Sequence, residues 1–114
     1  MIEIKNARIT SARLIIENGS FLCVWLGLDY GDGCQSFGGW VLHNCATKTR
    51  EPVNFAGIYI YEILKIAEED SWDRLVGKTI RAKCRHDKVY EIGHILKNEW
   101  FNPEEKFKGL RGEK

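Results

Sequence analysis

The Asn18-Gly19 pair constrains the fold more than any other feature, because it separates two stretches of β character. Residues 2–17 alternate between apolar and polar side chains, with one slip near Asn6 and Ala7, which predicts strands over 2–9 and 12–17 with room for a bulge. Residues 21–28 are apolar almost throughout, as in a strand covered on both faces, so we expect Trp25 in the core. Asn-Gly favours the tight turn of a hairpin between them.

One segment has clear helical periodicity. Apolar residues recur at helical spacing over 55–69, and Asn54 is suited to cap the first turn. We also expect a short turn over 71–77 and a short helix from Pro103, capped by Asn102.

The remaining segments are predicted as strands and loops. A turn at 29–33 precedes a return strand over 34–42, the polar stretch 44–54 is a loop, and strands over 78–85 and 89–96 form a second hairpin. The chain is thus predicted to be α+β, with an antiparallel sheet of about six strands and one main helix (55–69) packed on a face. We expect one domain over 1–114, with residues from about 110 to 114 frayed.

Composition excludes several classes of protein. Leu, Ile, Val and Phe number 31 of 114 residues, too many for a disordered chain, and the net charge of +1 excludes a uniformly basic coat protein. No apolar run reaches the roughly 18 residues of a membrane span, and the N-terminus lacks the pattern of a secretory signal. We therefore expect a cytoplasmic protein with free thiols and no membrane partner.

Two Cys/His pairs offer a metal-site hypothesis. His43 and Cys45 precede the helix, and Cys84 and His86 follow it. Thiolate and imidazole are the ligands that zinc prefers, but zinc sites rarely use pairs separated by one residue. The favoured interpretation is that Cys84 is a core thiol, with no metal and no cofactor bound.

A glycine-rich segment follows the first hairpin. It lacks both the Gly-Lys-Ser/Thr of a phosphate loop and the helix that must follow. Paired glycines in a strand indicate a bulge or the close approach of a backbone or ligand. The candidate segment for such an approach comprises Gln35, Phe37, Gly38, Gly39 and Trp40.

The charges are segregated along the chain. Residues 74–97 carry seven Lys/Arg and two Asp/Glu, whereas residues 1–73 carry six and ten. Arg81, Lys83 and Arg85 alternate along one predicted strand, with Lys88 in the turn. Tyr90, Trp100 and Phe101 lie nearby in the sequence. Such a stripe suits phosphate contacts and base stacking, although solvated strand faces often carry the same pattern.

Several short motifs together resemble a family of small proteins encoded by tailed phages and prophages. They are Asn6-Ala7, Leu28-Asp29-Tyr30-Gly31, Gln35-x-Phe37-Gly38-Gly39-Trp40-x-Leu42, Ile92-Gly93-His94-Ile95 and Trp100-Phe101-x-Pro103. The resemblance implies an accessory protein in the cytoplasm of an infected bacterium, and it carries over no catalytic residue.

These observations leave three hypotheses for the function. The first is a non-enzymatic binding module, monomeric or homodimeric, that acts on a host protein or defence complex. The second is direct nucleic-acid binding through the basic hairpin over 78–90. The third is a small-ligand site or enzyme at segment 33–40, using His43 or His94.

Overall fold

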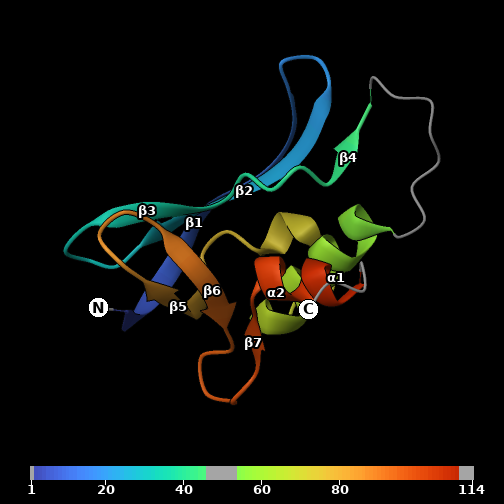
Figure 1. The fold of residues 1–114 in the computed structure, drawn as a ribbon. Helices are drawn as coiled ribbons and strands as arrows, with labels where there is room; N and C mark the ends of the chain where they lie inside the picture. Colours follow the sequence, from blue (N-terminus) through green and yellow to red (C-terminus); the bar gives the residue numbers. More distant parts are fainter. Residues whose placement is uncertain (1, 46–53, 111–114) are drawn as a thin grey trace.

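The structure, a computed structural model, describes residues 2–45 and 54–110. These residues form an antiparallel seven-stranded sheet with two α-helices (Figure 1), so the predicted α+β class is confirmed. The strand order is β3-β2-β1-β5-β6-β7, and β4 pairs separately with β2. The strands are β1 (Glu3–Glu17), β2 (Phe21–Asp29), β3 (Cys34–Gly38), β4 (His43–Asn44), β5 (Thr79–Cys84), β6 (Val89–Gly93) and β7 (Trp100–Phe101).

Strand β1 is one long strand rather than the two predicted segments. Its first part pairs with β5, from Glu3 to Arg8, and its second part pairs with β2, from Arg8 to Glu17. The irregularity lies between Ile9 and Ser11, after this change of partner, and not at Asn6. Beyond this point β1 and β2 continue as a hairpin arm that rises from the body of the molecule (Figure 1).

The prediction that Trp25 belongs to the core is wrong. Val24, Leu26 and Leu28 are buried, whereas Trp25 is only half-buried. Side chains alternate between the two faces of a strand, so Trp25 projects to the face opposite Leu26. The continuous apolar run of β2 concealed this alternation.

The predicted return strand over 34–42 is interrupted. β3 ends at Gly38, where φ is +145° and a Cβ would lie 2.0 Å from the carbonyl oxygen of Val24. The chain approaches β2 too closely there for any side chain, and it pairs again only at β4. Most of the predicted loop over 44–54, and the tail over 111–114, lie outside the described residues.

The main helix, α1 (Phe55–Ala67), begins and ends close to its predicted limits. The Asn54 side chain caps it by accepting a hydrogen bond from the Gly57 N–H at 2.8 Å. It ends two residues early because Glu68 adopts a left-handed conformation. A 3-10 turn, η1 (Trp72–Arg74), and a second helix, α2 (Pro103–Leu110), follow in the predicted places.

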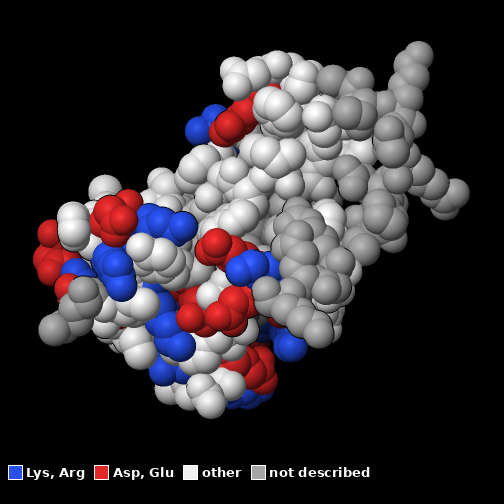
Figure 2. Space-filling view, in the orientation of Figure 1, with Lys and Arg blue, Asp and Glu red and all other residues white. Residues whose placement is uncertain are grey.

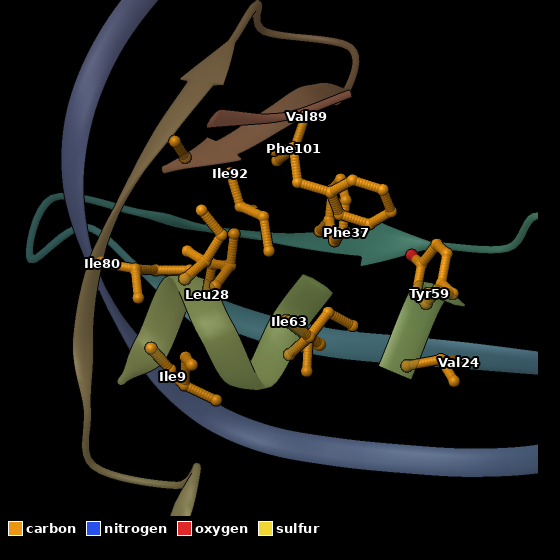
Figure 3. Packing of buried hydrophobic residues seen from close by; sticks show 14 of the residues in the cluster. Ile9, Val24, Leu28, Phe37, Tyr59, Ile63, Ile80, Val89, Ile92 and Phe101 are labelled. Carbon is orange, nitrogen blue, oxygen red and sulfur yellow. The ribbon is translucent and has the colours of Figure 1, made fainter. Parts of the chain in front are cut away.

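Aromatic residues from separate elements meet in the core (Figure 3). The rings of Phe37 from β3 and Phe101 from β7 lie 6.1 and 5.3 Å from that of Tyr59 on α1. This helix therefore covers the inner face of the curved sheet.

The sheet also curls back on itself. β3 lies against β6 although the two strands are not ladder partners (Figure 1). The Gln35 amide donates to the carbonyls of Arg85 at 2.7 Å and His86 at 3.2 Å, and its oxygen accepts from the Tyr30 hydroxyl. This bridge holds the turn between β5 and β6 beside β3.

Candidate nucleic-acid interface

A groove of about 550 Å³ lies where β3 meets the turn between β5 and β6. It brings together parts of the glycine-rich segment and of the basic hairpin, which lie about 50 residues apart in the sequence. Its lining includes Trp25, Gln35, Ser36, Gly38, Gly39, Trp40, His86, Asp87, Lys88 and Val89. Phe37, named with the same segment, is instead buried in the core.

Gly39 lets the Trp25 ring lie against the backbone of the groove. Its φ is +88°, and a Cβ there would lie 2.6 Å from Cη2 of Trp25. The indole N–H of Trp25 donates to Glu17 Oε1 at 2.7 Å. Hydrogen bond and glycine together set the orientation of a half-buried ring that lines the groove.

Trp40 lines the groove beside Lys88. Its ring packs on Phe37, with centroids 5.3 Å apart, and on Tyr59, at 6.2 Å. Lys88 Nζ lies 5.8 Å from the Trp40 centroid. Trp40 thus contacts both the aromatic core and a cation at the surface.

The turn between β5 and β6 combines two cations with an aromatic ring. Lys88 Nζ lies 4.8 Å, and Arg85 Cζ 5.7 Å, from the centroid of Tyr90. Both cations are exposed, and neither forms an ion pair with the residues that the structure describes. They are the members of the predicted basic stripe that remain open to an anionic ligand.

The other two members of the stripe are engaged elsewhere on the sheet. Arg81 and Lys83 lie 4.7 and 4.2 Å from the centroid of Trp100. Arg81 also donates to the carbonyls of His94 and Lys97, each at 2.7 Å, and Lys83 pairs with Glu91. Two residues of the stripe, Arg81 and Lys83, are therefore held in contacts within the protein. The other two, Arg85 and Lys88, remain exposed without an ion-pair partner among the described residues.

A second hollow, of about 230 Å³, adjoins the groove and shares Gln35 and His86 with it. Lys5 and Tyr30 also line this hollow, with Lys5 Nζ 5.0 Å from the tyrosine centroid. Burial raises the pKa of the Tyr30 phenol above its ordinary value.

Charged side chains concentrate on the part of the molecule that contains β3, β5 and β6 (Figure 2). In the same view, much of the surface over the β1–β2 arm is uncharged. Acidic groups lie among the basic ones, as in the pairs of Lys83 with Glu91 and Lys5 with Asp32. Arg85 and Lys88 thus lie on a surface that carries both acidic and basic side chains, not on a uniformly basic face.

The side chain of His94 is held by hydrogen bonds within the protein. It is buried, and its Nδ1 accepts hydrogen bonds from the N–H groups of Leu96 at 3.0 Å and Lys97 at 2.9 Å. Its Nε2 therefore carries the proton and donates to the Glu68 carboxylate. This bond lowers the pKa of Glu68, with a further contribution from the charge of Lys97. Both ring nitrogens are occupied, which disfavours His94 as a general base.

The Cys/His pairs do not converge on a common point. Within residues 2–45 and 54–110, no three His, Cys, Asp or Glu side chains are grouped so that they could hold a metal ion. His43 lies on β4, next to the start of β2, and it does not line the groove. All four cysteines are free thiols, with Cys23 and Cys84 buried and Cys34 and Cys45 exposed.

Sequence reasoning missed one aromatic residue of this surface, Trp25, and named Tyr90 only as a neighbour of the basic stripe in the sequence. An alternating reading of β2 would have placed Trp25 on the outer face, since Leu26 and Leu28 have the parity of the core. The contact of Tyr90 with Arg85 and Lys88 depends on how the chain turns between the strands. No feature of the sequence specifies that turn in such detail.

Comparisons with known proteins returned no matching family model, curated protein or solved structure. The resemblance to phage proteins therefore stays a prediction. Among the described residues, no helix is long and apolar enough to cross a membrane.

Proposed function

We propose that this protein binds single-stranded nucleic acid in the groove between β3 and the turn between β5 and β6. The observation that carries the proposal is the juxtaposition of Trp25 and Trp40 with Lys88 in one groove. Bases stack on the tryptophan rings, and the phosphates contact Lys88 in the groove and Arg85 in the adjoining hollow. The combination of aromatic platforms and cations along a groove is typical of single-strand binding without strong sequence preference.

The connectivity of the sheet supports this proposal. Apart from the two-residue strands β4 and β7, three meandering strands, a helix and two further strands follow one another, with β1 central and β3 curled toward β6. This order resembles that of the OB-fold, a partly open Greek-key barrel that binds oligonucleotides on its second and third strands and adjoining loops. The groove occupies the corresponding surface, formed by β2, β3 and the turn between β5 and β6.

The groove favours unpaired bases over a duplex. A tryptophan can stack only on a base whose face is open, and bases within a duplex already stack on one another. Trp25 and Trp40 belong to the sheet and the adjoining segment, so they are in place before the ligand arrives. Little ordering of the protein is then needed on binding.

A salt series of binding to fluorescein-labelled oligo(dT) and oligo(U), followed by anisotropy, tests the proposal. Single-strand binding loses about 0.7 in the slope of log K against log salt for each phosphate contact removed. We therefore expect the variant R85Q/K88Q to bind more weakly and to reduce the slope by about 1.4.

The matched control is K106Q/K108Q, which removes two exposed cations from α2, outside the groove lining. It makes the same change in net charge, so equal effects of the two variants would show that binding depends on overall charge alone. Equal effects, an unchanged slope in R85Q/K88Q or no binding at low salt would each contradict the proposal.

A second candidate function is the binding of a host protein by a phage accessory protein. It is favoured by apolar residues around the Trp100 cluster: Leu96 is 85% exposed, and Ile4, the β1 partner of Lys83, is 57% exposed. A partner co-purified from infected cells that is lost with L96E but retained with R85Q/K88Q would support this function. The absence of any co-purified partner would contradict this function, and retention of the partner by L96E would contradict the surface assigned to it.

A further inference from the structure

The far part of β1 has an open edge. β5 covers β1 only as far as Arg8, which pairs with Thr79, whereas β2 pairs with β1 up to Glu17. The Trp72 indole donates to the Ala12 carbonyl at 3.3 Å and so covers the beginning of this edge. Backbone polar groups of alternate residues point to the same edge of a strand, so those of Leu14 and Ile16 point outward with that of Ala12.

This edge also carries apolar side chains. Leu14 is 49% exposed and Ile16 is 56% exposed, and Ile15 between them is half-buried. Proteins usually protect a free edge with charges, a proline, a bulge or a covering element. Within residues 2–45 and 54–110, none of these protects residues 14–16, so the edge can pair with another strand.

We propose that two copies of this chain form a dimer in which their β1 strands pair antiparallel about Ile15. In this register Leu14 forms a hydrogen-bonded pair with Ile16 of the second copy, and the twofold axis repeats the pair. The two Ile15 residues face each other at the axis. Such an isologous contact closes on itself and joins the two sheets into one.

Charge complementarity supports a second copy as the partner and selects the register. With Ile15 on the axis, Arg13 lies opposite Glu17 of the second copy, and opposite charges in directly paired positions stabilise a strand pair. Centring the pair on Leu14 instead sets Arg13 against Ile15 and Glu17 against Ser11. That register loses both ion pairs and leaves the charges opposite uncharged side chains.

The dimer places equivalent groups on one face. Directly paired residues point to the same side of a sheet, and Arg13 is the partner of Trp25 within one copy. The Trp25 rings of both copies therefore lie on the same face of the joined sheet. If the groove binds nucleic acid as proposed above, one strand can reach both grooves and gain affinity from the linkage. The dimer itself does not depend on that function.

Site-specific cross-linking tests the register. In a C23A/C34S/C45S background, which also removes the cysteine directly opposite Ile15 on β2, single cysteines replace Arg13, Leu14 or Ile15, and the protein is oxidised gently. Non-hydrogen-bonded partners have Cα atoms about 4.5 Å apart, which suits a disulfide, so I15C should cross-link at least roughly tenfold faster than R13C or L14C. Fastest cross-linking at position 14, or none at 15, would overturn the proposed register.

Charge reversal tests the interface without cysteines. Sedimentation velocity over a concentration series should show a dimer for the native chain, with its dissociation constant raised roughly tenfold by R13E or by E17K and restored in R13E/E17K. K106E, which makes on α2 the same charge change as R13E, should leave the constant unchanged, and circular dichroism checks that each variant is folded. A native chain that stays monomeric, or a double variant no better than the singles, would overturn the proposal.

Discussion

Replacing Trp25 by alanine gives the sharpest test of the stacking role assigned to the groove. Trp25 is half-buried, lies against Gly39 and lines the groove, and its removal takes away one base platform without emptying the buried core. Stacking of a base on an aromatic side chain contributes about 1–3 kcal/mol by alanine substitution. The dissociation constant for a single strand should therefore rise by about 5- to 150-fold.

The loss should be similar for oligo(dT) and oligo(dA), because each base offers a face for stacking. Anisotropy titration at a fixed salt concentration measures it, and the salt slope should stay close to that of the native chain because no phosphate contact is removed. Trp25→Ala should thus weaken binding at an unchanged salt slope, whereas R85Q/K88Q should reduce the salt slope.

The matched control for this variant is Tyr61→Ala, which removes an aromatic side chain that is 62% exposed on α1 and does not line the groove. We expect native affinity for this control. If Trp25→Ala binds within about twofold of the native chain while remaining folded, a difference of about 0.4 kcal/mol, then Trp25 is not a base platform and the stacking argument fails.

Three further predictions concern stability. Gly93→Ala would place a Cβ 2.4 Å from Cε3 of Trp100, so we expect denaturant titration to show a free energy of unfolding lower by about 1–3 kcal/mol; native stability would show that the ring moves at no cost. The Tyr59 hydroxyl is buried with no hydrogen-bond partner in the described part of the chain, so Tyr59→Phe should raise thermal stability, by about 1 kcal/mol, and a marked decrease would reveal an unrecognised partner. The hydrogen bond from His94 lowers the folded-state pKa of Glu68. The ionised carboxylate therefore stabilises the fold above the unfolded-state pKa, and this stabilisation is lost as pH falls through the folded-state pKa. Urea titrations should show a stability difference between the native chain and Glu68→Gln that shrinks in acid, and a constant difference would contradict this linkage.

The sequence predicted the elements that local chemistry determines. Asn54 is followed by a helix because its side chain caps the N–H of Gly57, and Asn18-Gly19 forms the hairpin turn because both residues adopt positive φ. The ends of strands that the sequence failed to predict depend on contacts between distant segments. Gly38 ends β3 because the backbone of Val24 lies too close, and that neighbour cannot be identified from local pattern.

The candidate site shows the same division between local and distant causes. Segment 35–40 and the basic hairpin were each recognised as unusual, but nothing in the sequence said that they belong to one groove. Their juxtaposition depends on the Gln35 bridge to the carbonyls of Arg85 and His86, backbone groups that every residue carries and that leave no compositional trace. The same bridge explains why Gln35, although in the candidate segment, is committed to structure: its amide and oxygen are both bonded within the protein. The proposed function therefore assigns ligand recognition to the side chains around it, Trp25, Trp40 and Lys88, which line the groove from three different segments of the chain.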